Sequence, residues 1–192
     1  MEIRIETSAR HIHLTAEDYR TLFGEKDPTK IKELSQKDMA CEESVTVIGP
    51  KASLTNVRVI VPFRERTQLE ISKTDCFMIG IDAPLRISGS FPGADIQIKG
   101  PSGTINKDVA IVAKRHLHLP PSEAAELALS VGDIVGVEIP GSRGLTFSHV
   151  VVRIDDKYTA ALHLDTDEAN AAGISNESIG DLIINKDLKI LL

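Results

Sequence analysis

SARHIHLT at residues 8–15 is the stretch that decides the fold, because AKRHLHLP at residues 113–120 closely repeats it. The first histidines of the two copies, His11 and His116, lie 105 positions apart. Similarity between distant segments is the sign of an internal repeat, in which each copy forms one structural unit. The sequence therefore predicts two related halves, each containing an HxH pair.

A second pair of segments supports the repeat. Aligning NVRVIVP at residues 56–62 with HVVVRI at residues 149–154 gives a spacing of 93 positions, and the same spacing carries Glu70 onto His163. The two spacings differ by 12 residues, which an insertion in the polar segment 24–43 accounts for. Each copy then contains an HxH pair followed by a third possible metal ligand.

Short strand-like segments dominate the rest of the chain. They are rich in β-branched residues and bounded by Gly, Pro, Asn or Asp, which is typical of β-barrels and β-sandwiches. Two helices are expected, at residues 15–24 and 122–132, because each begins with a capping hydroxyl residue, Thr15 or Ser122, and ends at a glycine. The expected fold is mainly β, with two related β-barrel halves and a few short capping helices. The expected strands are 2–6, 44–48, 56–61, 67–72, 95–99, 134–139, 149–153 and 182–185.

The boundary between the halves is expected within residues 81–112, which have no partner in the repeat and are rich in turn formers. Pro101 to Gly103 is the best candidate for the turn between them. The halves are therefore predicted at residues 1–100 and 101–192, and the N-terminal strand could pack with either half.

The composition is that of a globular protein, with 42% hydrophobic and 26% charged residues. A net charge of −6 and an aromatic content of 4% argue against nucleic-acid and anionic-membrane binding. The N-terminus shows no signal peptide and no segment is apolar enough to span a bilayer, so a cytoplasmic protein is expected. Cys41 and Cys76 lack a CxxC spacing, which favours free thiols that pack in the core.

Each HxH pair can present two imidazoles to one ion, because residues two apart on a strand point to the same face. A third ligand from another strand would complete an open site, and imidazole with carboxylate is a ligand set of catalytic zinc. An isolated HxH pair is more often a surface feature, but two pairs in matching RHxHL contexts favour metal binding. The predicted ligands are His11, His13 and Glu70 in the first half and His116, His118 and His163 in the second.

Arginine and serine side chains near these ligands are candidates for binding an anion. Arg64 and Arg66 precede Glu70 in PFRERTQLE, and a guanidinium can bind phosphate or carboxylate in bidentate fashion. Spacing alone leaves the choice between the two arginines open. Ser88, with Arg86 in PLRISGS, forms a further candidate anion site.

Three further residues lie close to the ligands in sequence, and each has more than one candidate role. Arg10 and Arg115 precede the histidine pairs, and strand alternation points them away from the metal, toward a second shell or the phosphates of a bound ligand such as CoA. Asp165 is a candidate extra ligand, second-shell acceptor or helix cap. His149 aligns with Asn56 and is expected to be a structural or surface residue.

One rival motif predicts a different function. His11 and His13 with Glu17 and Gly24 also fit the cupin pattern HxHxxxE followed by a glycine, which predicts one iron or manganese ion. However, Glu17 falls in the first turn of an expected helix, and the alignment of Glu70 with the second half is left unexplained. A bicupin-like mononuclear metal oxygenase is therefore the second hypothesis, beside a non-catalytic metal-binding or scaffolding protein.

Several longer motifs follow one another along the chain: SARHIHLT, GPK, NVRVIVPFRERTQLEIS, APLRISGS, KGPSG, AKRHLHL and LHLDTDEANAAG. In order and spacing they resemble the PduL-type phosphotransacylases, also called phosphate propanoyltransferases. The resemblance covers nearly the whole chain. It implies two β-barrel halves, two divalent metal ions, usually zinc, and the interconversion of acyl-CoA plus phosphate with acyl phosphate plus CoA.

The resemblance also implies roles for single residues. The ligands of the first half would hold a metal ion that the CoA sulfur can approach. Those of the second half would hold a metal ion whose coordination is completed by water or phosphate. Arg64, not Arg66, matches the phosphate-binding arginine of the family, and Ser88 matches a serine near the phosphate. Ala52 after GPK and Val61 before Pro62 depart from the usual glycines, which affects loop detail only.

The mechanistic hypothesis is direct attack of phosphate, bound by metal and Arg64, on the thioester at a two-metal site, with no covalent enzyme intermediate. The resemblance implies acetyl-CoA or propanoyl-CoA as substrate, acetate or propionate kinase as a pathway neighbour, and a homodimer. Some relatives carry an N-terminal extension that directs them into bacterial microcompartments. The first histidine pair of this chain begins at His11, so we expect a free cytosolic enzyme.

Overall fold

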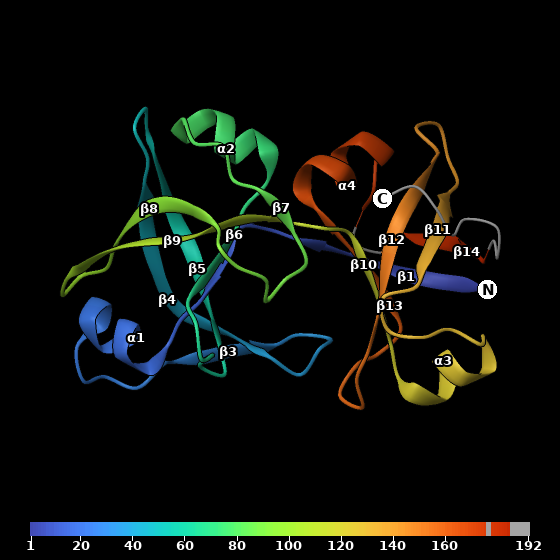
Figure 1. The fold of residues 1–192 in the computed structure, drawn as a ribbon, viewed down its shortest axis with the longest axis horizontal. Coiled ribbons are helices and arrows are strands. Elements are labelled where there is room, and N and C mark those ends of the chain that lie inside the picture. Colours follow the sequence, from blue (N-terminus) through green and yellow to red (C-terminus); the bar gives the residue numbers. More distant parts are fainter. Residues whose placement is uncertain (176–177, 185–192) are drawn as a thin grey trace. The chain divides into compact units, whose positions relative to one another are not determined.

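The computed structural model describes residues 1–175 and 178–184, which form two compact units that are each built on a closed β-barrel (Figure 1). We call residues 9–113 the N-barrel, and residues 1–8 together with the chain from 114 onward the C-barrel. The fold is mainly β with four short helices among the described residues, as predicted. Within the same residues, no helix is long and apolar enough to cross a membrane.

The N-barrel is a ring of six strands that two further strands extend. Its strands are β2 (His11–His13), β3 (Lys30–Glu33), β4 (Met39–Ile48), β5 (Ser53–Val61), β6 (Gln68–Glu70), β7 (Leu85–Arg86), β8 (Ala94–Lys99) and β9 (Thr104–Ala113), and its helices are α1 (Ala16–Phe23) and α2 (Lys73–Ile79). The ring runs β4–β5–β2–β6–β9–β8 and closes because β8 pairs with both β9 and β4. β3 is added beside β4, and β7 beside β9.

The C-barrel is a closed ring of six strands. Its strands are β1 (Glu2–Ser8), β10 (His116–Leu119), β11 (Ile134–Ile139), β12 (Leu145–Ile154), β13 (Ala161–Asp165) and β14 (Ile179–Ile183), and its helices are α3 (Pro121–Glu126) and α4 (Thr166–Ala172). The ring runs β1–β13–β10–β12–β11–β14 and closes where β14 pairs with β1. The expected strand at 182–185 overlaps β14, and position 185 lies outside the described residues.

The two rings match strand for strand. β2 runs parallel to β5 and antiparallel to β6, as β10 runs parallel to β12 and antiparallel to β13. β9 is parallel to β6 in the same way that β1 is parallel to β13. β3 has no counterpart in the C-barrel and lies within 24–43, where the repeat predicted an insertion. The fold therefore contains the internal repeat that the sequence predicted.

Each barrel includes the strand that precedes the histidine pair of the other barrel. β1 belongs to the C-barrel but leads into β2 of the N-barrel, and β9 belongs to the N-barrel but leads into β10 of the C-barrel. The chain therefore passes between the units twice, at Ser8–Ala9 and at Ala113–Lys114. The expected boundary at 100/101 differs from this division, because the turn at 101–103 only joins β8 to β9, which pair with each other.

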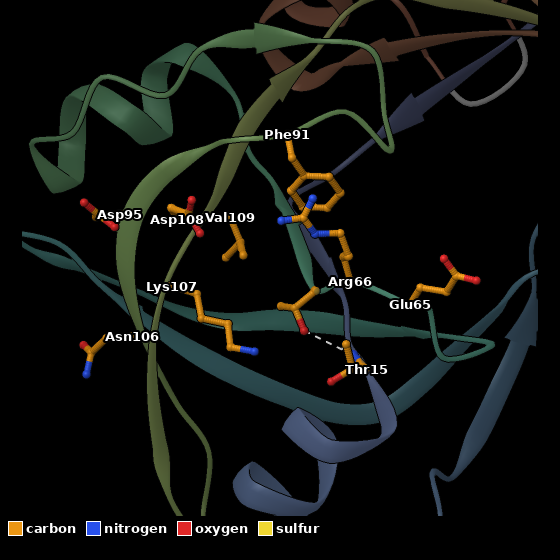
Figure 2. Close-up of a pocket in the computed structure, with 10 residues that line it drawn as sticks. Thr15, Glu65, Arg66, Phe91, Asp95, Asn106, Lys107, Asp108 and Val109 are labelled. Atoms are coloured by element: carbon orange, nitrogen blue, oxygen red, sulfur yellow. Dashed lines mark hydrogen bonds between the residues drawn. The ribbon is translucent and has the colours of Figure 1, made fainter.

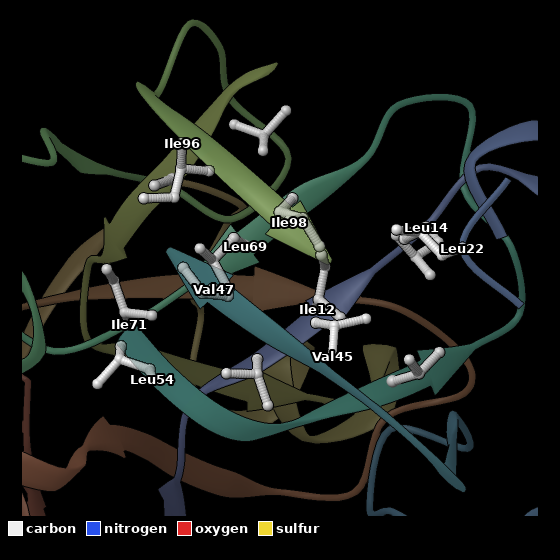
Figure 3. Packing of buried hydrophobic residues seen from close by; sticks show 14 of the residues in the cluster. Ile12, Leu14, Leu22, Val45, Val47, Leu54, Leu69, Ile71, Ile96 and Ile98 are labelled. Atoms are coloured by element: carbon white, nitrogen blue, oxygen red, sulfur yellow. The ribbon is translucent and has the colours of Figure 1, made fainter. Parts of the chain in front are cut away.

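Strand alternation separates the core from the histidines. Ile12 and Leu14 are fully buried in the N-barrel core, where Figure 3 shows them among the branched side chains of the other strands. Leu117 and Leu119 are equally buried in the core of the C-barrel. The histidines at the intervening positions therefore lie on the opposite face of each strand. Burying one such side chain stabilises the fold by about 1.5–3 kcal/mol, so the core fixes the strands on which the histidine pairs lie.

A matching β-bulge appears in both barrels. The register shifts between Val45 and Val47 in the N-barrel and between Val135 and Val137 in the C-barrel. On the partner strands, Asn56 and His149 have φ angles of 57° and 56°. Asn and His are among the few non-glycine residues enriched in this left-handed region. We infer that His149, which is exposed and belongs to neither ligand group, is present because histidine tolerates this left-handed backbone position of the repeat.

One of the two expected helices is confirmed and the other is corrected. α1 begins at the predicted cap, with the Thr15 side chain accepting from the backbone of Asp18, and ends at Gly24. α3 was expected to begin at a Ser122 cap, which is wrong: Pro120 is the N-cap, without a side-chain bond, and Pro121 opens the helix. Proline suits that position because the first helical N–H groups have no partner to lose.

Two further helices follow the strands that carry the third candidate ligands. α2 begins with a capping box formed by Ser72 and Asp75, and α4 with one formed by Asp165 and Glu168. Each helix has seven residues, which is too short for a helical pattern of apolar residues to show in the sequence. These two helices were therefore not predicted.

Candidate metal centres and anion site

The N-barrel brings together its three predicted ligands. His11 and His13 point from the same face of β2, and Glu70 lies directly opposite His11 on the antiparallel strand β6. A nitrogen or carboxylate oxygen from each lies within 4.8 Å of the others, and His11 Nε2 is 3.7 Å from Glu70 Oε2. Two imidazoles and one carboxylate at this spacing can bind a divalent ion.

The C-barrel forms the equivalent group from His116 and His118 on β10 and His163 on β13. His116 and His163 are directly opposite in register, as are the first histidine and the third ligand of the N-barrel. Potential ligand atoms of the three lie within 4.8 Å of one another. Glu70 and His163, which the sequence alignment matches, thus occupy equivalent positions on equivalent strands of the two rings.

The first histidine of each pair is oriented by the backbone. His11 Nδ1 lies 2.9 Å from the carbonyl oxygen of Ala9, and His116 Nδ1 lies 2.9 Å from that of Lys114. Because a carbonyl only accepts, Nδ1 must carry the proton, which leaves the lone pair of the neutral ring on Nε2. This is the usual second interaction of a metal-binding histidine.

His118 is held as a neutral ring with one buried nitrogen. Burial, with smaller contributions from His163 and His116, lowers its pKa well below the ordinary histidine value. The ring stacks on Tyr158, with centroids 3.8 Å apart. Its Nε2 is buried and has no hydrogen-bond partner in the part of the chain that the structure describes. A buried unpaired lone pair is costly, and a metal ion would satisfy it.

A chain of polar contacts leads from the N-barrel group to Arg64. Ser88 Oγ donates to Glu70 Oε1 and lies 3.5 Å from Arg64 Nη1. The Arg64 guanidinium is also 4.0 Å from the buried carboxylate of Asp38. One third of the arginine side chain remains exposed, so an anion can still reach it. The structure therefore places Ser88 against Glu70, and Arg64 against Ser88.

Gln68 is a further residue of this site that the sequence did not single out. It is fully buried, lies opposite His13, and accepts from the backbone N–H of Gly89 at 2.8 Å. Its amide also donates to the Ser90 carbonyl, so it holds the loop that carries Ser88. Its position two residues before Glu70 on the same strand face was the available signal.

Arg66 has a different environment from Arg64. Arg66 lines a pocket of about 470 Å³, and none of the six candidate ligands lines this pocket. Figure 2 shows the arginine beside the Phe91 ring, and its guanidinium carbon is 4.2 Å from the ring centroid. Lys107, the other cation of this pocket, pairs with Asp18 at 2.7 Å. The lining also contains three carboxylates, from Glu65, Asp95 and Asp108. The pocket is therefore not electrostatically suited to a phosphate.

The arginines before the histidine pairs bind acidic residues at the capping boxes. Arg10 lies 3.2 Å from Asp75 of α2, and Arg115 lies 2.7 Å from Glu168 of α4. Arg115 also donates to the carbonyl of Ser148 at 3.2 Å. Each arginine thus ties the start of its histidine strand to the helix that follows the third ligand.

Asp165 and the two cysteines also have defined environments. Asp165 Oδ1 accepts from the Glu168 backbone at 2.8 Å and caps α4, which was one of its three expected assignments. Cys41 and Cys76 are buried and free, and burial raises the pKa of both thiols. A protonated, buried thiol is a poor nucleophile.

Comparisons with known proteins cover both barrels. Residues 4–175 match the family model described as phosphate propanoyltransferase. Proteins of that name from Clostridioides difficile and Thermotoga maritima are 43% and 44% identical to the chain, over 94% of it and over 88% and 87% of their own lengths. The protein of that name from Salmonella typhimurium is 44% identical, over 91% of the chain and 85% of its own length. The matched residues include all six candidate metal ligands.

Proposed function

The chain belongs to the phosphate propanoyltransferase family, and from this premise we propose that it interconverts a short-chain acyl-CoA and inorganic phosphate with an acyl phosphate and CoA. One observation carries the proposal beyond family membership: each barrel presents a group of three metal-ligating side chains. Acetyl-CoA and propanoyl-CoA are the expected substrates.

The donor sets fit two divalent ions, one in each barrel, and Zn²⁺ is the ion we propose. Neutral imidazole and carboxylate are the ligands that zinc prefers in catalytic sites. The buried Nε2 of His118 and the Nε2 lone pairs of His11 and His116 support this assignment. When bound, such an ion supplies Lewis-acid chemistry, polarising a thioester carbonyl or stabilising a departing thiolate.

Phosphate binds at Arg64 in this proposal, with Ser88 beside it. The guanidinium is positively charged at all physiological pH values and its fork of N–H groups matches two phosphate oxygens. Asp38 holds the guanidinium from its other side, at 4.0 Å. An oriented, charge-stabilised phosphate gains rate because the attacking oxygen is already positioned.

The proposed reaction has a single transfer step. A phosphate oxygen forms a bond to the acyl carbon, the carbon–sulfur bond breaks, and CoA leaves as a thiolate that later takes up a proton. Arg64 stabilises the phosphate charge while this happens. No covalent acyl-enzyme is required, which agrees with the burial of both cysteines.

A thiol-release assay with acetyl-CoA or propanoyl-CoA tests the proposal. CoA release that depends on added phosphate, with about two zinc ions per chain by elemental analysis, is the expected result. Release that is independent of phosphate would indicate a hydrolase, and none with either substrate would favour a metal-binding protein. Parallel rates with the two substrates identify the preferred acyl group.

The oxygenase alternative is not favoured by the geometry. The cupin pattern requires a ligand at Glu17 on a strand, but Glu17 lies in α1. The carboxylate grouped with His11 and His13 is instead Glu70. If elemental analysis found one iron or manganese ion per chain, the oxygenase would nevertheless become the favoured function.

The proposal extends to the cellular setting. An acetate or propionate kinase transfers the phosphoryl group of an acyl phosphate to ADP, which yields ATP and a carboxylate, so such a kinase is the proposed pathway neighbour, in the cytoplasm. The assembly proposed is a homodimer. A coupled assay with the kinase and the sedimentation of the purified protein test these two points.

A further inference from the structure

An acidic side chain lies beside the histidine group of the C-barrel without being part of the predicted ligand set. Glu6 is on β1, and the parallel register pairs it with His163 of β13. Paired residues on neighbouring strands point to the same face of the sheet. Glu6 Oε2 lies 3.5 Å from His163 Nε2, so the carboxylate reaches the edge of the histidine group.

The distance fits two ligands of one ion. Two atoms bound to the same tetrahedral zinc ion at about 2.1 Å lie roughly 3.4 Å apart. The separation of 3.5 Å in the C-barrel is close to that value and slightly shorter than the 3.7 Å between His11 Nε2 and Glu70 Oε2 in the N-barrel. By this one distance Glu6 lies as close to His163 as Glu70 lies to His11, whereas the group whose ligand atoms all lie within 4.8 Å of one another contains the three histidines alone.

Equivalent rows of the two barrels differ in where the carboxylate lies. Across β9, β6 and β2 the N-barrel row is Ile111, Glu70 and His11, and across β1, β13 and β10 the C-barrel row is Glu6, His163 and His116. Each row therefore contains one carboxylate, displaced by one strand. Ile111 is fully buried, so the N-barrel has an apolar residue where the C-barrel has Glu6.

The two oxygens of Glu6 face different groups. Oε1 contacts the guanidinium of Arg4, whose side chain is 63% exposed, whereas Oε2 faces His163 in a region where Glu6 itself is only 19% exposed. The surface ion pair with Arg4 is of a kind that contributes little to stability. Oε2 therefore points toward the place where the histidines would hold a cation. Three neutral imidazoles would not offset the charge of that cation, whereas a carboxylate would.

We propose that Glu6 binds the same divalent ion as His116, His118 and His163. The N-terminal strand thereby supplies a fourth protein ligand to the C-barrel, while the N-barrel ion has three and keeps a position open for substrate. The proposal rests on the proposed function only in assuming that the histidine group binds metal.

Cobalt binding tests this assignment, because Co²⁺ replaces zinc and its visible d–d absorption reports its ligands. The parent is the full chain carrying His11→Ala and His13→Ala, which leaves the C-barrel group as the metal centre. In this parent, Glu6→Gln is expected to weaken Co²⁺ binding at least tenfold, measured by competition with a chelating dye, since loss of even an indirect ligand contact costs about 10–100-fold. The d–d bands are expected to shift.

Two matched controls accompany the variant. Glu2→Gln makes the same chemical change on the same face of β1 and is expected to alter neither affinity nor spectrum. Arg4→Gln removes the surface ion pair but leaves the carboxylate, and is expected to preserve the affinity. If the parent does not fold, Co²⁺ titration of the chain without the histidine changes gives the same comparison, and Glu6→Gln is then expected to weaken one of the two equivalents.

Several outcomes would overturn the proposal. Unchanged affinity in Glu6→Gln, or an equal loss in Arg4→Gln, would show that the carboxylate does not hold the ion. A weaker affinity with unchanged d–d bands would place Glu6 outside the coordination sphere. If neither the parent nor the unmodified chain bound Co²⁺, the proposal of a metal centre would itself be overturned. If the parent binds Co²⁺ and Glu6→Gln has no effect, only the assignment of Glu6 is overturned.

Discussion

The N-barrel and the C-barrel place their histidine pairs on matching strands, yet surround them with different chemistry. In both, the first histidine is oriented by the carbonyl two residues earlier and faces the third ligand across an antiparallel pair. The N-barrel group then contacts Ser88 and, through it, Arg64. The C-barrel group is instead flanked by the Tyr158 ring and Glu6.

This difference separates what the repeat supplies from what each copy adds. The repeated strands, bulges and capping boxes fix where three ligands meet. The residues that differ decide whether the group is joined to an anion-binding arginine or enclosed by an aromatic ring and a carboxylate. The two metal groups are thus expected to have unequal roles, and the following changes test this from the largest expected effect to the smallest.

Removing one ligand from each barrel should have the largest effect. We expect His13→Ala and His118→Ala each to lose one of two zinc equivalents and to lower turnover by about 10³-fold, since a metal contributes several kcal/mol to transition-state stabilisation. Elemental analysis and the thiol-release assay measure both. A variant that retains turnover with one equivalent would remove that barrel's group from the reaction.

Arg64→Ala tests the anion-binding side of the N-barrel. We expect kcat/KM to fall by about 10²–10³-fold, as for loss of a group that stabilises developing charge, while two zinc ions are retained. Arg66→Ala is the control, because that arginine stacks on Phe91 instead. Equal losses in the two variants would contradict the specific role of Arg64.

Ser88→Ala tests the link between the metal group and the arginine. Its hydroxyl contacts both Glu70 and Gln68, so its loss should weaken zinc binding in the N-barrel by about 10-fold, at the low end for partners of metal ligands. Ser90→Ala makes the same change two residues later, where only the backbone carbonyl contacts Gln68. If the two variants bind zinc equally well, Ser88 does not position the ligand.

The arginines at the capping boxes should affect stability unequally. Arg115→Gln removes a contact with Glu168 and one with the Ser148 carbonyl, and we expect a loss of about 1 kcal/mol in the free energy of unfolding. Arg10→Gln removes only the ion pair with Asp75, in which the arginine side chain is 40% exposed and the carboxylate 8%, for about 0.5 kcal/mol. Urea unfolding of both variants measures the difference, and a larger loss in Arg10→Gln would reverse the comparison.

The smallest effect is expected from the cysteines, which occur only in the N-barrel. Because burial raises the pKa of Cys41 and Cys76, both thiols stay protonated at neutral pH and should react slowly with iodoacetamide. The double variant with alanine at both positions should keep its turnover. Loss of all turnover in a folded, zinc-loaded double variant would indicate a covalent mechanism.

The sequence predicted the repeat and the grouping of residues on its strands because both depend on spacing. Strand alternation and the shift of 93 positions were sufficient to group Glu70 with the first histidine pair and His163 with the second. The ends of α1 could also be predicted, because they depend on the capping residues Thr15 and Gly24 at the ends themselves.

What the sequence did not predict depends on partners distant in the chain. No local pattern tells that β1 pairs with β13 and β14, so neither the unit boundary nor the position of Glu6 could be derived. Gln68 was overlooked because its role comes from a loop twenty residues later. α2 and α4 were too short to show a helical period.

The exchange of β1 and β9 has a consequence for the order of folding on the ribosome. The N-barrel strands, from β2 to β9, are contiguous, so this barrel has all its strands once β9 has emerged. Among the described strands β1 is synthesised before all others, but its neighbours β13 and β14 are synthesised after all others. Such distant pairing is slow because the intervening chain must be ordered first. The C-barrel can therefore close only after β14 has emerged, and β1 stays without its partner strands until then.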